Sequence, residues 1–583
     1  MTMKYRSMIL LAVAAITLGN AVECPGMDVD VEVLGVDGDA KKNVLAYLRI
    51  YQEKDEKDFS LARLKSLHSQ AESQIKKGLQ PFGFYNVKVQ SELRGPEGSR
   101  DKWSARYVIE PGQPVVVKSV HFRITGEGAE DPVFSDEFGM KFGEVLVHEK
   151  YENAKQHLMS VAAKHGYLDA RFEKRRVVVD ASDNSASIEI VFNTGPRYRI
   201  GEVRILQDLL APEFVNRYVT FRQGDPYDWD RLRTFQGNLI DSEYFREVEV
   251  VALREEAEGG LVPLEVRTRT SRPNKLRFGL GFATDVGPRF TMDWHRRYIG
   301  RYGHKLYAEV SLSPVIKKLI GEYRIPLENP VTDYLSMKPE INWYDTPSRD
   351  GETYTVELSY SIKQAGWRRT LGLDFRFEDY NIATQSETGN ELVPYASWTR
   401  VVSDSPIYTS RGYRLKTSFL GAVEGVLSTA SYFSSTFHAK LIRSFLEDYR
   451  FVTRSDLGVT LAENVDVLPA SRRFFAGGDT SIRGYDLEEL GPVDSASGRV
   501  VGGRYLAVGS VELERRIYGK WSGALFYDVG NAFDPDYSNT ITQGAGFGIR
   551  WLSPVGLIRL DLAFALSREG CPVRLHLVVG PDL

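Results

Sequence analysis

The sequence predicts α+β repeats on the N-terminal side, followed by an all-β transmembrane barrel of about 16 antiparallel strands. Three observations support this fold class. The chain opens with a segment typical of export signals, and a pattern of strands and helices then repeats as far as about residue 272. From Lys275 onward the helical periodicity disappears, and segments of alternating hydrophobicity recur to the C-terminus.

The first 21 residues are typical of a cleaved signal peptide. Lys4 and Arg6 precede the apolar run MILLAVAAITL, and GNA then supplies small residues where a signal peptidase cuts. The apolar run is shorter than the ~20 residues of a spanning helix, which disfavours a membrane anchor. The two cysteines, Cys24 and Cys571, provide no disulfide framework and no metal-ligand cluster.

The region after the signal peptide is predicted to form three related α+β domains. Gly83 and Gly166 are 83 residues apart, and so are Gly112 and Gly195, which indicates a repeat. Each unit is expected to run strand, helix, helix, strand, strand. Its small sheet keeps an open edge that is either inert or able to accept a strand from another chain. The domains are expected at residues 27–113, 114–198 and 199–273.

The barrel is predicted over residues 274–583. In GLIRLDLAFAL (556–566), for example, apolar side chains alternate with Arg559 and Asp561. An apolar face toward lipid and a charged face toward a wet lumen are typical of transmembrane β-strands. The alternative is a tandem of β-sandwiches, but no domain boundary interrupts the series of strands.

The composition argues against several classes of function. The chain has 74 Lys and Arg against 78 Asp and Glu, a net charge of −4, so nothing indicates a nucleic-acid partner. No two of the nine histidines stand at a metal-ligand spacing with a supporting acid, and P-loop and G-x-S-x-G motifs are absent. We therefore expect no cofactor, no metal site and no catalytic residues. A barrel hydrolase assembled from distant residues is the remaining enzymatic alternative.

A glycine- and charge-rich insert, FFAGGDTSIRGYDLEELGP (474–492), interrupts the series of strands. Alternation in the next two strands places Glu512, Glu514 and Asp528 on the lumen side. Confined carboxylates repel one another and favour a nearby cation. Arg483 lies on the glycine-flanked insert, and its planar fork can bind one carboxylate bidentately and contact another. The alternative is a solvated arginine on an external loop.

Two motifs in this region resemble those of a known superfamily. SIRGY is similar to the [VI]-R-G-[FY] motif in the sixth extracellular loop of the outer-membrane barrel-assembly superfamily, which contains BamA and TamA. FYDVG matches its F-x-D-x-G motif. The residues concerned are Ile482, Arg483, Gly484 and Tyr485 in the loop, and Phe526, Asp528 and Gly530 in the strand.

Within the superfamily, the chain is most similar to the TamA family. FFAGGDTSIRGY, TGPRYRIGEV and the C-terminal GIRWLSPVGLIRLD carry this likeness. Three repeats, which would be POTRA domains, also fit that family better than five in BamA-like proteins or two in two-partner transporters. The resemblance covers essentially the whole mature chain. One departure is the final leucine, because most outer-membrane barrels end in an aromatic residue.

The resemblance implies a barrel in the Gram-negative outer membrane with its POTRA domains in the periplasm. It implies that Arg483 pairs with Asp528 and with Glu512. The expected function is non-enzymatic help in inserting or secreting outer-membrane β-barrel proteins, autotransporters among them. The implied partners are a TamB-like protein that spans the periplasm, nascent client proteins and outer-membrane lipid. The alternative is an outer-membrane channel, or a dedicated protein exporter, with the loop as a plug.

The first and last strands of the barrel are predicted to join weakly. Glycine weakens a strand, and proline cannot donate a ladder hydrogen bond. Such a seam between residues 275–284 and 574–583 would lend strand edges to a client, whose backbone cannot enter lipid unpaired. Ordinary closure, with glycines serving curvature, is the alternative. The residues behind this prediction are Gly279, Gly281, Gly580 and Pro581.

Overall fold

The structure is a computed structural model that describes residues 28–56, 59–96, 102–135, 137–405, 408–553 and 556–580. The predicted signal peptide, residues 1–21, lies outside the described residues, as do Cys24 and Pro581. None of the helices in these ranges is long and apolar enough to cross a membrane. The chain divides into two compact parts. The first part contains the first two α+β units, the second part contains the barrel, and the boundary between the parts passes through the sheet of the third α+β unit.

The first repeat packs helices against a three-stranded sheet of order β1-β3-β2, in which β1 runs parallel to β3. The longest helix begins where the Ser60 side chain accepts a hydrogen bond from the backbone N–H of Arg63, 3.2 Å away. Leu64, Leu67 and Ile75 lie on one face of that helix and are fully buried. The elements are β1 (Val29–Leu34), α1 (Gly38–Tyr47), α2 (Arg49–Glu53), α3 (Leu61–Leu79), the 3₁₀ turn η1 (Gln80–Phe82), β2 (Lys88–Arg94) and β3 (Trp103–Glu110).

The second repeat has the same sheet plan, of order β4-β6-β5, but one α-helix among its described residues where two were predicted. A 3₁₀ turn stands in place of the first helix. Gly126 and Gly143, both with positive φ, bracket this region, and Pro132 lies between them, so a continuous helix is disfavoured there. The elements are β4 (Val116–Thr125), η2 (Glu127–Glu130), α4 (His148–Lys164), β5 (Arg171–Asp180) and β6 (Ser185–Asn193).

The third unit is a sheet of order β7-β9-β8 with one longer helix, whose Leu232, Phe235 and Leu239 are buried. These three residues recur at helical spacing, which explains the amphipathic pattern in the sequence. The elements are β7 (Arg199–Leu206), α5 (Pro212–Val215), η3 (Asn216–Tyr218), α6 (Trp229–Asp241), β8 (Phe245–Ala252), η4 (Arg254–Glu256) and β9 (Leu261–Thr270).

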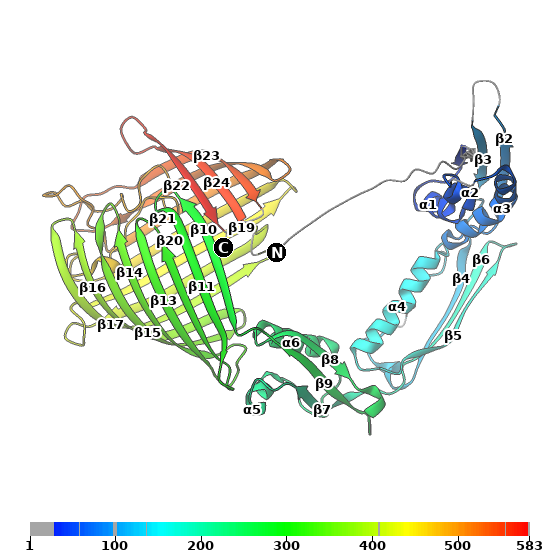
Figure 1. Ribbon diagram of the computed structural model, residues 1–583, viewed down its shortest axis with the longest axis horizontal. Coiled ribbons are helices and arrows are strands. Elements are labelled where there is room, and N and C mark those ends of the chain that lie inside the picture. Colours follow the sequence, from blue (N-terminus) through cyan, green and yellow to red (C-terminus); the bar gives the residue numbers. More distant parts are fainter. Residues whose placement is uncertain are drawn as a thin grey trace, which may run out of the picture. The chain divides into compact units, whose positions relative to one another are not determined.

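A closed barrel of sixteen strands, β10 to β25, follows the third unit, and neighbouring strands run antiparallel (Figure 1). This confirms the predicted fold class. The strands are β10 (Asn274–Ala283), β11 (Gly287–Ile299), β12 (His304–Leu312), β13 (Ile316–Pro326), β14 (Tyr334–Asp345), β15 (Arg349–Gln364), β16 (Trp367–Ile382), β17 (Gln385–Ser403), β18 (Arg411–Ala422), β19 (Tyr432–Phe445), β20 (Tyr449–Leu461), β21 (Tyr505–Tyr518), β22 (Trp521–Phe533), β23 (Thr542–Ser553), β24 (Gly556–Ala565) and β25 (Val573–Gly580), with a 3₁₀ turn η5 (Ala470–Arg472) in the connection between β20 and β21.

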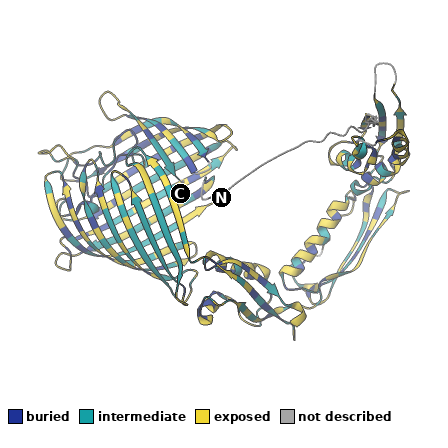
Figure 2. Ribbon diagram, viewed as in Figure 1, coloured by how far each residue is buried: buried dark blue, intermediate teal, exposed yellow. Residues whose placement is uncertain are grey.

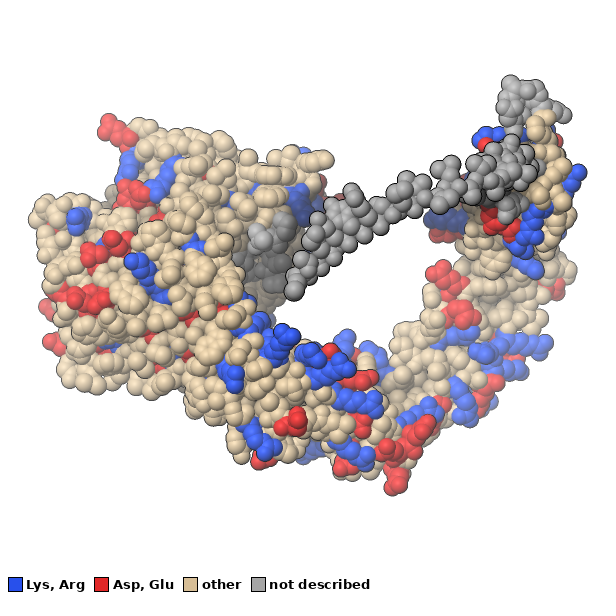
Figure 3. Space-filling view, viewed as in Figure 1, with Lys and Arg blue, Asp and Glu red and all other residues tan. Residues whose placement is uncertain are grey.

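The barrel strands alternate between an apolar outer face and a polar inner face. In β22, Leu525 is 64% exposed and Tyr527 is 38% exposed, whereas Asp528 between Tyr527 and Val529 is fully buried. Exposed and less exposed residues alternate in the same way along many strands in Figure 2. Figure 3 shows that the visible barrel wall is mostly uncharged, while Lys, Arg, Asp and Glu gather on the repeats. Such a surface suits contact with lipid.

The turn between β11 and β12 packs against the third unit. The Tyr244 hydroxyl donates a hydrogen bond of 2.5 Å to the carbonyl oxygen of Gly303, and a Cβ at Gly303 would overlap the ring of Phe214. Lys305 Nζ donates to the carbonyl oxygen of Ser242 at 2.6 Å. Burial raises the pKa of Tyr244, so its hydroxyl stays protonated and remains a donor.

The Tyr244→Phe variant is expected to loosen this junction, because the Gly303 carbonyl loses a buried donor at a cost of about 0.5–1.5 kcal/mol. Limited proteolysis of the purified protein should then show cleavage near residues 271–275 that is a few times faster than in the wild type, as a loss of about that free energy implies. Tyr302, on the same turn, is 52% exposed. Tyr302→Phe is therefore the matched control, and an equal effect of the two substitutions would contradict the role of Tyr244.

Candidate functional site: the lumen loop

The connection between β20 and β21, residues 462–504, carries Arg483 into a buried position against the inner wall of the barrel. Its Nε and Nη2 donate to the two carboxylate oxygens of Asp528 at 2.8 and 2.9 Å. Its Nη1 donates to Glu512 Oε2 at 2.7 Å. The structure therefore brings together the three charged residues that alternation and the resemblance had paired.

Asp561 of β24 is a third carboxylate at this site, which the sequence did not assign to Arg483. Its Oδ2 accepts from Arg483 Nη1 at 3.1 Å. Arg550 of β23 lies on the other side and donates to Glu512 at 2.7 Å and to Asp561 at 2.5 Å. Three carboxylates are thus shared by two guanidinium groups, and removal of either cation leaves buried negative charge. Both Asp561 and Arg550 occupy inward positions, which is the signal that could have found them.

Glu514, also predicted to face the lumen, does not contact Arg483. It accepts instead from Arg450 of β20, at 2.7 Å, and both side chains are almost fully buried. Burial opposes the charge of Arg483, but Asp528 and then Glu512 raise the pKa of its guanidinium above the ordinary value. Arg483 therefore carries a positive charge at neutral pH, as arginine does in proteins generally.

Phe526 and Ser510 complete the set of side chains that surround Arg483 and Asp528. The guanidinium carbon lies 3.5 Å from the centre of the Phe526 ring, a cation–π contact. Ser510 Oγ donates to Asp528 Oδ1 at 2.6 Å. The backbone N–H of Arg483 also donates to Asp528 Oδ2, at 3.0 Å. The carboxylate of Asp528 is thus saturated by donors and fixes both the side chain and the backbone of the loop.

Glycines give the loop room to approach the wall. Gly484 has φ +100°, a backbone conformation that favours glycine, and it lies against Phe564 and Ala565 of β24. A Cβ at Gly544 of β23 would overlap the carbonyl oxygen of Arg483. Gly530 of the predicted motif has φ +145°, and a Cβ there would overlap the carbonyl oxygen of Ala507 on β21. The motif glycines therefore serve close backbone contacts.

The apolar residues of the loop motif also bind the loop to the barrel. Ile482 is fully buried, and Tyr485 is almost so; both pack in a small cluster with Val508 of β21 and Ala565 of β24. The Tyr485 hydroxyl donates to the carbonyl oxygen of Gln543 at 3.2 Å. The four residues of the motif thus each make a separate contact with the wall, and burial of the two apolar side chains adds to the polar contacts.

The loop contacts the last strand through His576. The backbone N–H of Gly484 donates to His576 Nε2 at 2.9 Å, so Nε2 is the acceptor and Nδ1 carries the ring proton toward Asp479. Asp479 in turn accepts from the backbone N–H of Asp285, in the turn after β10, at 3.1 Å. The sequence did not predict this chain of contacts, since its members come from three distant segments.

Asp285, Asp479 and His576 offer ligand atoms within 4.8 Å of one another, an arrangement that could hold a metal ion. The hydrogen bonds account for the arrangement without one. A cation on Nδ1 of His576 would move the ring proton to Nε2, where the N–H of Gly484 already points. The cluster is therefore assigned as a hydrogen-bonded link between the loop, the first turn and the last strand.

Further ion pairs fasten the loop to the opposite part of the wall. Arg349 of β15 donates to both carboxylate oxygens of Glu488 in the loop, at 3.2 and 2.8 Å. Arg472, also in the loop, donates to Glu391 of β17 at 2.9 Å. Because Arg483 binds carboxylates of β21, β22 and β24, the loop is attached to the inner wall on two sides of the lumen.

The junction of β10 and β25 is short. The only aligned pair of the two strands among the described residues is Ala283 with Val578. Three hydrogen bonds extend the contact. The Thr284 N–H and Oγ1 donate to the Leu577 carbonyl at 3.1 and 3.4 Å, and the Leu577 N–H donates to Thr284 Oγ1 at 2.6 Å. By contrast, β24 and β25 are aligned over eight pairs.

The glycines predicted to weaken this seam do not pair across it. Gly279 and Gly281 are aligned with Thr291 and Arg289 of β11, and Gly580 is aligned with Leu557 of β24. Pro581 lies outside the described residues. The short junction is therefore a property of how far the two end strands overlap.

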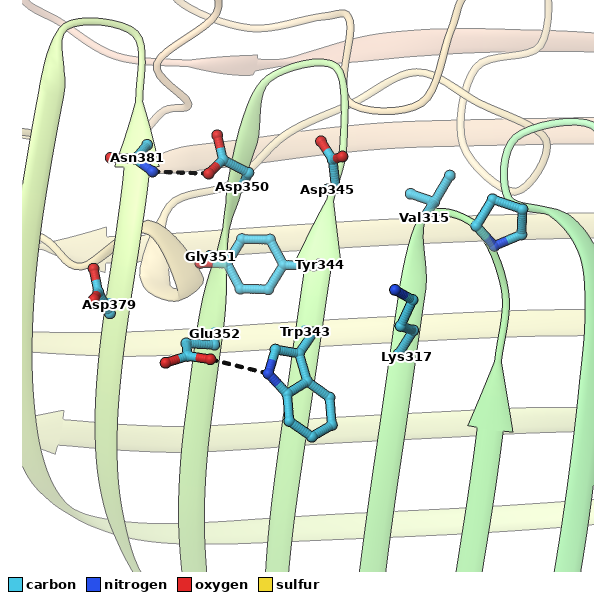
Figure 4. A pocket seen from close by; sticks show the side chains of 11 residues that line it. Val315, Lys317, Trp343, Tyr344, Asp345, Asp350, Gly351, Glu352, Asp379 and Asn381 are labelled. Atoms are coloured by element: carbon cyan, nitrogen blue, oxygen red, sulfur yellow. Dashed lines mark hydrogen bonds between the residues drawn. The ribbon is translucent and has the colours of Figure 1, made fainter.

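A pocket of about 630 Å³ lies elsewhere, on β13 to β16 near the end of the barrel where the β14–β15 turn lies (Figure 4). Asn381 donates to Asp350 at 2.8 Å, and the Trp343 indole N–H donates to Glu352 at 2.9 Å. None of its lining residues belongs to the lumen loop or to the carboxylates around Arg483.

Family comparisons agree with this architecture. A model described as the Omp85 superfamily domain matches residues 272–574, and models described as POTRA domain TamA domain 1 and as a surface antigen variable number repeat match residues 30–111 and 115–195. The protein is an outer-membrane β-barrel with periplasmic POTRA domains. The chain belongs to the Omp85 superfamily, and its first POTRA domain is of the TamA type.

Two curated relatives are outer membrane protein assembly factors named BamA. The one from Nitratidesulfovibrio vulgaris is 22% identical over 438 residues, 70% of this chain and 54% of the relative. The one from Neorickettsia risticii is 20% identical over 400 residues, 64% of this chain and 53% of the relative. The chain thus spans about half the length of the curated relatives it matches.

The solved structures supply a neighbour for the fold. BamA from Haemophilus ducreyi lacking POTRA domains 1–3 superposes with a TM-score of 0.68 at 14% identity, over 80% of this chain and 99% of that chain. At this identity the likeness concerns the fold alone. It supports the confirmed arrangement of a closed barrel preceded by α+β repeats.

Proposed function

We propose that this protein is a non-enzymatic assembly factor that helps to insert or secrete outer-membrane β-barrel proteins, autotransporters among them. The observation that carries the proposal is the short junction of β10 and β25, which has a single aligned pair among the residues that the structure describes. The description of the two curated relatives as assembly factors supports the same role. A barrel closed by so few contacts opens at less cost than one joined by a full ladder.

The seam offers what an inserting strand needs. A client strand cannot enter lipid with its backbone N–H and C=O groups unpaired. Parting Thr284 from Leu577 frees the edges of β10 and β25, which can then pair with the client as an added strand. The lumen loop contacts β25 through Gly484 and His576. The loop also contacts the β10 side, where Asp479 accepts from the N–H of Asp285, so opening of the seam is proposed to part this contact while the loop keeps its hold on β25.

The domain organisation proposed for this function is a signal peptide at residues 1–21, POTRA domains at 27–113, 114–198 and 199–273, and the barrel at 274–583. The third sheet, β7-β9-β8, supports the third POTRA domain because its strands and helix repeat the plan of the first two. The proposed partner is a TamB-like, periplasm-spanning protein, and the match of residues 30–111 to the first POTRA domain of TamA supports that choice. Client proteins and outer-membrane lipid complete the proposed contacts.

A cross-link across the seam tests the proposal. Ala283→Cys and Val578→Cys, in a chain with Cys24→Ser and Cys571→Ser, join the single aligned pair. The oxidised protein is expected to fail to restore the outer-membrane proteome of cells that lack the native protein, and reduction is expected to return the function. A disulfide that closes a strand pair does not unfold the barrel, so the cross-linked protein should still migrate as folded.

The matched control joins two strands away from the seam. Ser434 of β19 and Thr460 of β20 are aligned, buried and hydrogen-bonded at 2.9 Å. Ser434→Cys with Thr460→Cys is expected to leave the proteome unchanged in both redox states. Full function of the oxidised seam variant would refute opening at this seam.

The second candidate is a channel or a dedicated protein exporter with the loop as a plug. The observation in its favour is the position of the loop in the lumen, held by Glu488 on one side and Arg483 on the other. Planar-bilayer conductance separates the two functions. A large, steady pore in the native protein favours the channel, and a closed barrel favours the assembly factor. Turnover of lipid or peptide by the purified protein would instead identify a hydrolase.

A further inference from the structure

Arg504, the last residue of the lumen loop before β21, repeats the contacts that Arg483 makes farther along the loop. Its Nε and Nη2 donate to the two carboxylate oxygens of Asp534, at 2.8 Å each. Its backbone N–H donates to Asp534 Oδ2 at 3.2 Å. Arg483 makes the same three hydrogen bonds to Asp528, at 2.8, 2.9 and 3.0 Å. The loop therefore contains two arginines that each bind one carboxylate through the side chain and the backbone together.

The remaining contacts of Arg504 join the two ends of the loop. Its Nη1 donates to the carbonyl oxygens of Ala462 and Glu463, the first two residues after β20, at 3.0 and 2.9 Å. Its Nη2 also donates to Asp536 Oδ2, at 2.6 Å. The backbone carbonyl of Arg504 accepts from the N–H of Thr460 at 2.7 Å. One side chain thus connects the start of the loop, the end of the loop and the segment that follows β22.

Arg473 joins the same two ends a short distance away. Its Nε donates to the carbonyl oxygen of Leu468 at 2.8 Å, and its Nη1 donates to that of Val501 at 3.3 Å. Phe474 and Gly503 exchange two backbone hydrogen bonds, of 2.8 and 2.9 Å. The side chains of both arginines are buried. The two ends of the loop therefore pack as one segment.

These contacts divide the loop into two parts, which we call the root (residues 462–474 and 501–504) and the finger (residues 475–492). The carboxylates that bind Arg483 in the finger belong to β21, β22 and β24. Those that bind Arg504 in the root belong to the segment after β22. Among the described residues, the two arginines share no carboxylate. Loss of one arginine thus leaves the ion pairs of the other in place.

We propose that Arg504 is a positioning residue that fixes the root of the loop, so that the finger can leave the wall and return while the root stays in place. Asp534 is 3% exposed, and without Arg504 its buried carboxylate would lose the cation that binds it. The root has a further ion pair with the wall, between Arg472 and Glu391, at 2.9 Å. The inference concerns the position of the loop and does not depend on the assembly role.

Thiol labelling of the full chain in detergent tests the proposal. In a chain with Cys24→Ser and Cys571→Ser, Val465→Cys places a probe in the root and Ala476→Cys places one in the finger; both positions are 1% exposed. Arg504→Ala is expected to speed labelling of the root probe about tenfold or more, because several buried hydrogen bonds of a charged group are lost. Labelling of the finger probe is expected to stay within about twofold of the wild type, as for an independent site.

The reverse pattern is expected for Arg483→Ala, with faster labelling of the finger probe and little change at the root probe. A loss of overall stability would speed labelling of both probes, so it would not produce this reversal. Arg504→Lys keeps the charge but not the fork, and should label between the wild type and Arg504→Ala. Arg499, an exposed arginine of the same loop, supplies the matched control, and Arg499→Ala is expected to label like the wild type at both probes.

Folding of each variant is checked by its heat-modifiable migration. Asp536→Asn, which removes one charged partner of Arg504, replaces Arg504→Ala if that variant fails to fold. Equal acceleration at the two probes would overturn the proposal, since the root and the finger would then leave together. Unchanged labelling of the root probe would overturn it as well. Labelling reports the position of the loop and the outer-membrane proteome reports assembly, so failure of this proposal is distinguishable from failure of the proposed function.

Discussion

The Arg483→Ala variant is expected to lose about 3–5 kcal/mol of barrel stability, because the substitution leaves Asp528, Glu512 and Asp561 buried around a single remaining arginine. The loss should appear as a lower urea midpoint for unfolding in detergent. The dependence of the free energy of unfolding on urea concentration should be unchanged if the folded and unfolded states keep their compactness. The loop should detach at the same time. Faster proteolysis between residues 474 and 492 would report that detachment.

Charge and geometry can be separated at this position. Arg483→Lys keeps the positive charge but cannot reproduce the fork that binds both oxygens of Asp528, so it should recover only part of the loss. Arg483→Glu should be inactive in outer-membrane assembly, and Asp528→Arg should partly restore it. Substitution of Arg568, an exposed loop arginine that pairs with Glu489, is the control for the substitutions of Arg483. Unaltered assembly and stability in Arg483→Ala would return Arg483 to the status of a solvated loop residue.

The contacts at Arg483 show how far the sequence predicts such a site. Alternation places Glu512 and Asp528 on the inner face without any knowledge of the fold, because successive side chains of a strand point to opposite sides. Alternation does not determine the register between strands, that is, which residues of neighbouring strands are aligned. Asp561 meets Arg483 because β24 lies two strands from β22 and is aligned with β23 at that height. No property of residues 556–566 by themselves reveals that relation.

The link through His576 is still less accessible to sequence analysis. Gly484, His576 and Asp479 come from the loop and from the last strand, and each looks ordinary in its own segment. The seam shows the same limit. Glycine and proline content predicted a weak junction, and the structure has a short one, but its length follows from the overlap of β10 and β25. Closure of a barrel depends on all sixteen strands together.

The repeats show the opposite case. Buried residues at helical spacing, such as Leu64 and Leu67 of α3, were sufficient to predict the helix. In the second repeat the same approach predicted one helix too many, because the helix-breaking effect of Gly126, Pro132 and Gly143 was not recognised. Local pattern thus predicts elements well where periodicity is long, and less well where turn residues interrupt it.

Gly544→Ala is expected to displace the loop without changing any charge. The new Cβ would occupy the position of the Arg483 carbonyl oxygen, and it would also contact Ile482 at 3.4 Å. Neither strand β23 nor the loop backbone can yield by rotating a side chain, so the loop must move. Overpacking costs about 1–3 kcal/mol by itself, and the loss of the Arg483 contacts adds to it. The urea midpoint and the proteolysis of residues 474–492 are the measurements.

Gly509→Ala is the matched control, since the added Cβ there meets only Val529 Cγ1, at 3.9 Å. A double-mutant cycle then decides whether Gly544 and Arg483 act through one event. If the loop leaves the wall in either single variant, the double variant Gly544→Ala, Arg483→Ala should be little less stable than the worse of the two. Additive losses would mean that the loop stays seated in Gly544→Ala. In that case the contacts of Arg483 would dominate over the close backbone approach at Gly544 in holding the loop in the lumen.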